Sequence, residues 1–121
     1  LLNSEVMKFN ADTAPTKMGT FSQYDYPKTL AKYASVAREL GVNGTDEECL
    51  EGLIKLIEDL KEKIGIKKTI KDYGISEQDF LINLDEMVLQ AFDDQCTGAN
   101  PRYPLLSEIK QIYLNAYYGT N

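Results

Sequence analysis

Apolar residues recur every three or four positions through most of this chain, and that spacing is the feature that most constrains its fold. Such spacing is typical of the buried side of an α-helix. It is clearest in a stripe formed by Leu50, Leu53, Ile54, Ile57, Leu60 and Ile64. Thr45 and Glu48 form a capping-box pattern before this stripe, and Gly65 suits the position just past its end. The sequence has no strand-like alternation of four or more residues, so it predicts an all-α fold.

The same period predicts about five helices, packed as a helical bundle in a single domain of residues 1–121. A helical stub at the N-terminus precedes a loop over 10–23. Pro27 then occupies the first position of a second helix, where its missing N–H costs nothing. The residues expected to face inward from that helix are Leu30, Tyr33, Ala37 and Leu40. Gly41 suits its end, and the helix after Thr45 follows.

Two further helices are predicted in the C-terminal half of the chain. A short turn over 69–73, ended by Gly74, precedes Ser76, which caps the first of them. The buried face of that helix is expected to be Phe80, Leu84, Met87, Val88 and Ala91. Ser107 is expected to open the last helix and Gly119 to stop it. Its expected inward residues are Ile109, Ile112, Tyr113 and Ala116. Glycine and proline within 96–101 exclude regular helix there.

The composition excludes several classes of function. Nineteen acidic residues against 13 basic ones give a net charge of −6, which argues against a nucleic-acid partner. No apolar run approaches the roughly 20 residues of a membrane-spanning helix, so no membrane partner is expected. The absence of histidine excludes Ser-His-Asp and Cys-His catalysis and iron or zinc held by imidazole. Two cysteines are too few for a thiolate metal cage.

The first residues suggest a piece of a longer protein. The chain starts at Leu1, and its first apolar residues are typical of the tail of a segment whose beginning is missing. These residues are Leu1, Leu2, Val6, Met7 and Phe9. No secretory signal precedes them, and we expect a cytoplasmic protein.

The loop near the C-terminus holds the residues that could carry chemistry. Asp93 and Asp94 could bind a hard cation through oxygen, or they could end a helix and accept hydrogen bonds from the next turn, which we favour. Cys96 could line a pocket, act as a nucleophile, or pack as a small apolar side chain. Without a histidine to activate it, nucleophilic catalysis is disfavoured. Cys49, just after a helix start, is expected to serve packing only.

Two other features leave alternatives open. Arg102, between Pro101 and Pro104, could clamp a carboxylate or phosphate of a ligand, or could pin the loop to Asp93 or Asp94, which we favour. The tyrosines at 113, 117 and 118 could form a docking surface, because tyrosine is enriched at interfaces. Packing of the last helix on its own core explains them equally well.

The segment 91–104, AFDDQCTGANPRYP, is the most specific signal in the chain. With Ser107-Glu108-Ile109-Lys110 and Tyr117-Tyr118-Gly119, it closely resembles the C-terminal end of bifunctional aldehyde-alcohol dehydrogenases. These fermentative enzymes reduce acetyl-CoA to acetaldehyde and then to ethanol. The likeness also includes 6–11, 22–27 and 59–71, and so extends over nearly the whole chain.

The resemblance implies that the chain is most of the helical lobe of an iron-dependent alcohol dehydrogenase, inactive alone. In that family one Asp and three His hold iron, and a nucleotide-binding lobe precedes the helical lobe. The three histidines and that lobe would lie upstream of Leu1, and the Asp is not identifiable in this chain. The parent would transfer hydride from NADH to acetaldehyde or another small aldehyde, with this chain walling the cleft. Cys96 is implied to shape the substrate pocket; no catalytic, cofactor-binding or metal residue is assigned.

Two other hypotheses belong beside this one. The chain could be a free-standing, non-enzymatic helical interaction module, as its acidic charge and well-capped helices would allow. It could also contribute a self-association surface, since the parent family forms filaments and the parent is expected to be a homo-oligomer or filament. A fragment should expose a large apolar patch where upstream helices pack, whereas an independent module should not.

Overall fold

The computed structural model describes residues 1–12 and 28–119, and over these ranges the chain contains five α-helices and no strand. The helices are α1 (Asn3–Ala11), α2 (Lys28–Glu39), α3 (Asp46–Lys63), α4 (Glu77–Asp93) and α5 (Leu106–Tyr118). Two 3₁₀ turns, η1 (Lys71–Tyr73) and η2 (Thr97–Ala99), lie before and after α4. The predicted all-α fold is confirmed. None of the described helices is long and apolar enough to cross a membrane.

The N-terminal prediction needs one correction. Asn10 and Ala11 belong to α1 and are buried, although a loop was predicted to begin at residue 10. The Asn10 side chain contacts Tyr33 of α2 and Asn100, so tertiary packing extends the helix past the sequence signal for a loop. The rest of that loop, and Pro27 at the expected start of the second helix, lie outside the described residues.

Helices α2 and α3 form a hairpin with its own apolar core. The cluster consists of Ala34, Ala37, Cys49 and Leu53, with Met7, Tyr33, Val42 and Ile57 packed against it. The predicted capping box is present, because Thr45 Oγ1 accepts the Glu48 N–H and the Glu48 carboxylate accepts the Thr45 N–H. Cys49 is fully buried, as its expected packing role requires.

The predicted inward faces of this hairpin are wrong at their ends. Leu40 is 61% exposed, because α2 ends at Glu39 and the chain turns at Gly41. Leu60 and Ile64 are 57% and 63% exposed. Helix α3 has 18 residues against 12 in α2, or about 27 Å against about 18 Å at the ordinary helical rise. Helix α2 therefore covers only the first part of the apolar stripe on α3.

Helices α4 and α5 enclose the second core. Phe80, Leu84 and Val88 of α4 are buried as predicted, with Met87 and Ala91 partly buried beside them. From α5, Ile109 and Ala116 are buried and Ile112 and Tyr113 are half-buried. The Tyr117 ring stacks on Phe80 with 4.3 Å between ring centroids.

The start of α5 differs from the prediction that Ser107 opens it. The helix begins at Leu106, and Ser107 is exposed in its first turn. The Glu108 carboxylate accepts the Leu105 N–H at 3.0 Å, which satisfies a backbone donor just before the helix.

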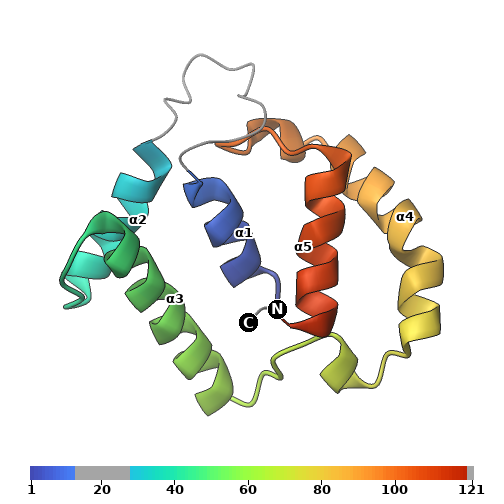
Figure 1. Cartoon of the computed structure of the whole chain (residues 1–121), viewed down its shortest axis with the longest axis horizontal. Coiled ribbons are helices and arrows are strands. Elements are labelled where there is room, and N and C mark those ends of the chain that lie inside the picture. Colours follow the sequence, from blue (N-terminus) through green and yellow to red (C-terminus); the bar gives the residue numbers. More distant parts are fainter. Residues whose placement is uncertain (13–27, 120–121) are drawn as a thin grey trace.

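Helix α1 lies between the two helix pairs and joins them through polar contacts (Figure 1). Ser4 donates to the Glu58 carboxylate of α3, and Asn115 of α5 donates to the Glu5 carboxylate at 3.1 Å. The buried side chains of α1 are therefore mostly polar. This arrangement positions α1 to line hollows on both of its sides.

Candidate functional site

The loop after α4 is held by short-range hydrogen bonds. Asp94 accepts the Cys96 N–H at 2.7 Å, and Thr97 donates its hydroxyl to the Ala91 carbonyl. Helix α4 ends at Asp93, so the favoured interpretation of the acidic pair, a helix end bound to the next turn, is confirmed. Within residues 1–12 and 28–119 no group of three metal-ligating side chains exists.

Cys96 lies at the edge of an apolar hollow of about 330 Å³, which we call the Cys96 groove. Its apolar wall is formed by Leu2, Val6, Phe9, Ile109, Ile112 and Tyr113. Asn10, Thr97 and Asn100 add polar groups to the lining. The Cys96 side chain is exposed and its thiol is free, whereas Cys49 is buried. A hollow of this size with few polar groups suits a small organic ligand.

Arg102 is a buried cation with partners that the sequence did not indicate. It is 6% exposed and does not pair with Asp93 or Asp94, so the favoured sequence interpretation is wrong in its partners. One terminal nitrogen donates to the Phe9 carbonyl at 2.9 Å and to Asp12 at 3.2 Å, and the other donates to Glu108. Burial of a charged guanidinium is costly unless hydrogen-bond acceptors and opposite charges surround it. Here Phe9 and Asp12, at the end of α1, and Glu108 of α5 provide them, and α4 does not.

Asn100 docks the same loop onto α1. Its amide nitrogen donates to Asn10 Oδ1 at 2.8 Å and to the Arg102 carbonyl at 2.6 Å. Neither Asn10 nor Asn100 was predicted from the sequence as a site residue. An asparagine before a proline in a loop is common, and nothing local marks a partner 90 positions away.

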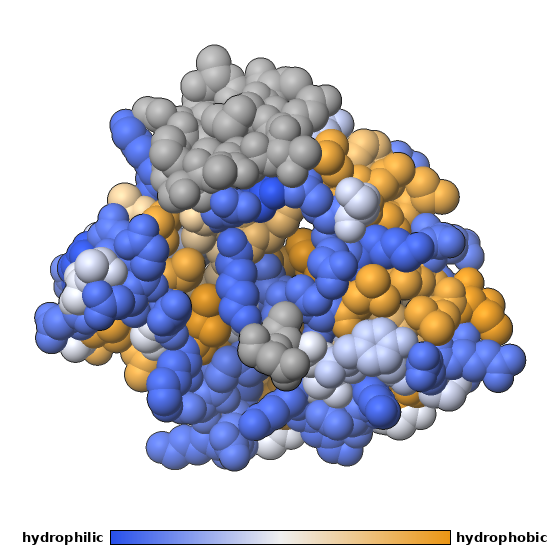
Figure 2. All heavy atoms as spheres, viewed as in Figure 1, coloured by the Kyte–Doolittle hydropathy of each residue, from blue (hydrophilic) through white to orange (hydrophobic). Residues whose placement is uncertain are grey.

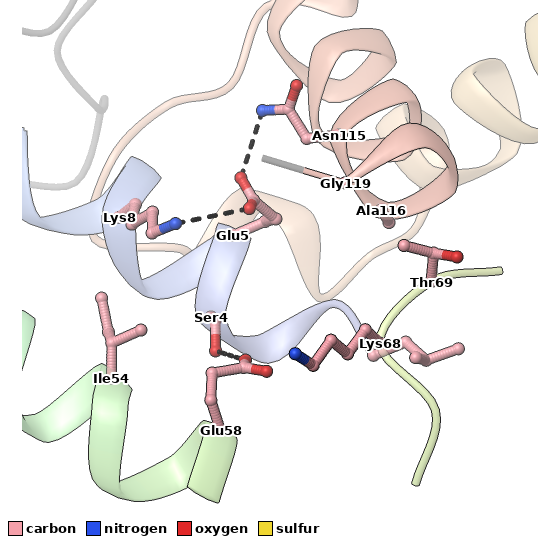
Figure 3. A pocket seen from close by; sticks show the side chains of 11 residues that line it. Ser4, Glu5, Lys8, Ile54, Glu58, Lys68, Thr69, Asn115, Ala116 and Gly119 are labelled. Carbon is pink, nitrogen blue, oxygen red and sulfur yellow. Dashed lines mark hydrogen bonds and ion pairs between the residues drawn. The ribbon is translucent and has the colours of Figure 1, made fainter. Parts of the chain in front are cut away.

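A second hollow, lined largely by polar residues, lies on the other side of α1 (Figure 3). There Glu5 is bound by Asn115 and by Lys8, whose ammonium lies 3.5 Å away, while Ser4 binds Glu58. Burial alone would raise the pKa of Glu58, but the hydrogen bonds from Lys61 and Ser4 outweigh it and lower that pKa below its ordinary value. The carboxylates of Glu5 and Glu58 are thus bound by side chains of the protein. In this hollow they link α1 to α5 and α3.

The tyrosines of α5 mainly serve packing. Tyr117 is 1% exposed and donates its hydroxyl to the Ile75 carbonyl at 2.8 Å. Burial and the nearby charge of Glu77 raise the pKa of Tyr117. Tyr118 is half exposed and donates to Glu77, a hydrogen bond that raises its pKa. Of the two open interpretations, packing on the core therefore accounts for Tyr117.

Comparison with known proteins places the chain among larger enzymes. A family model described as "Fe-containing alcohol dehydrogenase family, C-terminal" matches residues 1–117. The bifunctional aldehyde-alcohol dehydrogenase of Escherichia coli K12 is 48% identical over 98% of this chain. The aldehyde-alcohol dehydrogenase of Clostridium acetobutylicum is 48% identical over 97% of it. The NADPH-dependent butanol dehydrogenase of Clostridium saccharobutylicum is 37% identical over 95% of it.

The chain spans only a small part of these relatives. It covers 14% of the length of each of the two aldehyde-alcohol dehydrogenases. It covers 26% of the butanol dehydrogenase. The similarity therefore concerns one part of each relative, and their complete activities involve much more chain than this.

Proposed function

The chain belongs to the Fe-containing alcohol dehydrogenase family, and we propose that it is the helical C-terminal domain, residues 1–121, of an enzyme that reduces acetaldehyde and other small aldehydes to alcohols with NADH. The match of residues 1–117 to the C-terminal family model carries this proposal. The names of the aldehyde-alcohol dehydrogenase relatives support the substrate class. The proposal places the enzyme in the cytoplasm.

The described residues do not fit an iron site. No group of three metal-ligating side chains exists in residues 1–12 and 28–119, and the whole sequence has no histidine. We therefore assign no step through iron to this chain and place the metal ligands in the rest of the parent. It follows from the proposal that the chain alone is inactive and binds neither iron nor NADH tightly.

The proposed partner is the upstream nucleotide-binding lobe of the same parent chain. Leu56 and Leu60 of α3, and Ile64 just past its end, recur at intervals of four and are 42%, 57% and 63% exposed. Figure 2 shows hydrophobic side chains also gathered over α4, on the right of the view. Exposed apolar faces of this kind mark surfaces that another protein part covers. They favour a lobe of a larger enzyme over a free-standing module, and self-association of the parent would use whatever apolar surface the lobe leaves uncovered.

The Cys96 groove is the proposed contribution of this chain to substrate binding. Its apolar wall suits the alkyl part of a small aldehyde, and the exposed Cys96 lies at its edge. In this proposal Cys96 shapes the pocket and does not attack the substrate, because hydride transfer to a carbonyl needs no nucleophilic side chain.

The test is turnover by the full-length protein that contains this chain. We expect acetaldehyde-dependent oxidation of NADH, and we expect Cys96→Ser to change kcat/KM more than Cys49→Ser does at equal folded fraction. Inactivity of the metal-loaded protein toward small aldehydes with both NADH and NADPH would overturn the proposed function. Equal effects of the two serine variants would remove only the assignment of Cys96.

A further inference from the structure

Phe9 is the wall between two neighbouring hollows. It lines the Cys96 groove of about 330 Å³ on one side of α1. It also lines a hollow of about 480 Å³ that contains Arg102 and Glu108, which we call the Arg102 hollow. Ile112 of α5 is the other residue that borders both. One aromatic ring and one aliphatic side chain therefore stand between the apolar groove and the Arg102 hollow.

Arg102 holds this ring in place. The carbon at the centre of its guanidinium lies 3.8 Å from the centroid of the Phe9 ring, and the same group donates to the Phe9 carbonyl at 2.9 Å. The salt bridges to Asp12 and Glu108 keep the guanidinium from rotating away. A planar cation stacked on an aromatic face and bound on its edges is a rigid support.

We propose that Phe9, supported by Arg102, sets the upper length of the aliphatic aldehyde that the Cys96 groove accepts. The proposal rests on the proposed function and goes further by assigning chain-length selectivity to a named wall. Phe9 is the specificity-determining residue, and Arg102 is a positioning residue that acts through it. Removal of the ring frees the volume that the ring fills, and a longer alkyl chain can occupy that space. The Arg102 hollow beyond it is lined mainly by charged and polar side chains and is left to water.

The first test measures the groove without any catalysis. The probes are N-methylmaleimide and N-hexylmaleimide, which alkylate the exposed Cys96 thiol of the 121-residue chain, while Cys49 is buried. We expect Phe9→Ala to raise the hexyl-to-methyl rate ratio about tenfold, the low end of the discrimination that a hydrophobic pocket shows for one methylene group. Phe9→Tyr, which keeps the ring, should leave the ratio unchanged, and Arg102→Lys, which loses the planar stack, should give an intermediate ratio.

Controls separate the wall from general loosening of the fold. Ile82→Ala removes an apolar side chain that is 69% exposed on α4, outside the groove, and should not change the ratio. Cys96→Ser should abolish the fast labelling. Circular dichroism confirms that each variant is folded. An unchanged ratio in folded Phe9→Ala overturns the proposal.

The second test measures selectivity in the full-length enzyme. We expect Phe9→Ala to raise the kcat/KM ratio of hexanal to acetaldehyde about tenfold, mainly through a lower KM for hexanal. Phe9→Ala could change the labelling ratio of Cys96 and leave the aldehyde selectivity of an active enzyme unchanged. In that case the length-limiting role of Phe9 is wrong and the proposed function stands. If the wild-type enzyme reduces no aldehyde, the proposed function fails and this inference fails with it.

Discussion

Val42 fills the space beside Gly52 in the α2–α3 hairpin: a Cβ atom on Gly52 would lie 2.5 Å from Val42 Cγ1. Carbon atoms in contact lie about 3.5–4 Å apart. A Cβ atom at position 52 and the Val42 side chain therefore cannot both fit unless one of them shifts. Gly52 lies in the interior of α3, where glycine is normally unfavourable. Close approach of the turn after α2 explains its presence.

Gly52→Ala is therefore expected to destabilise the protein. In an uncrowded helix the change would stabilise by about 1 kcal/mol, but overpacking against the stiff Val42 side chain should cost about 1–3 kcal/mol. In a Val42→Ala background the same substitution should instead stabilise. Urea unfolding of the four proteins gives this double-mutant cycle. Stabilisation by Gly52→Ala in both backgrounds would show that the close approach does not exist.

Glu58 should make stability depend on pH. Its pKa in the folded protein lies below the ordinary value of 4.5. The contacts from Lys61 and Ser4 therefore stabilise the fold above pH 4.5. This contribution to the free energy of unfolding is lost as the pH falls through the lowered pKa. Glu58→Gln should cost about 0.2–1 kcal/mol at pH 7, a small value because the side chain is partly solvated, and less than that at pH 3.

Urea unfolding at the two pH values measures this difference. Glu51→Gln, an exposed change on the same helix, is the matched control for the loss of one negative charge. An equal loss at both pH values for Glu58→Gln would contradict the lowered pKa.

Leu84 and Leu81 provide a direct comparison of buried and exposed leucines on α4. Leu84 is 2% exposed in the second core, and Leu81 is 45% exposed. Leu84→Ala should lower the free energy of unfolding by about 2–5 kcal/mol, while Leu81→Ala should change it by at most about 0.5 kcal/mol. Chemical denaturation measures both. Similar losses would mean that α4 packs through a different face.

The exposed stripe on α3 should bind a hydrophobic dye. We expect the isolated chain to enhance the fluorescence of 1-anilinonaphthalene-8-sulfonate while it is folded, and Leu60→Gln with Ile64→Gln to reduce that enhancement. As a control, the circular dichroism spectrum of this double variant should match that of the wild-type chain. A folded wild-type chain that binds no dye would favour the free-standing module.

The isolated chain should lack the cofactor sites of its family. Because the described residues contain no group of three metal-ligating side chains, metal analysis of the freshly purified chain should find iron far below one equivalent. Titration followed by NADH fluorescence should show no tight binding. One equivalent of iron would contradict the proposal that the ligands lie elsewhere in the parent.

Local signals in the sequence were sufficient for the helices and many of their ends. Capping of α3 by Thr45 and of α4 by Ser76 involves groups only three residues apart, so both could be predicted without a fold. Gly41, Gly65, Gly74 and Gly119 all adopt the positive φ expected at helix ends. The buried face of α4 followed from its 3.6-residue period.

Contacts between distant residues could not be predicted in this way. Arg102 was expected to pair with Asp93 or Asp94, eight or nine positions away. It does bind Glu108, six positions away, but its other two partners, Phe9 and Asp12, are 90 or more positions distant. The end of the apolar stripe on α3 is exposed because α2 is shorter than α3. The relative length of two packed helices cannot be recognised in the sequence of either one.

The sequence by itself determined the all-α class, most helix boundaries and the family of this protein. The fold class and the helix boundaries depend on periodicity and capping, which involve residues close together in the sequence. The family follows from sequence similarity alone. Only the tertiary structure decided that Phe9 separates two hollows, that Arg102 supports it, and that Asn100 binds Asn10. The physical reason is that these contacts require α1 to lie between two helix pairs, and the packing of all five helices sets that position.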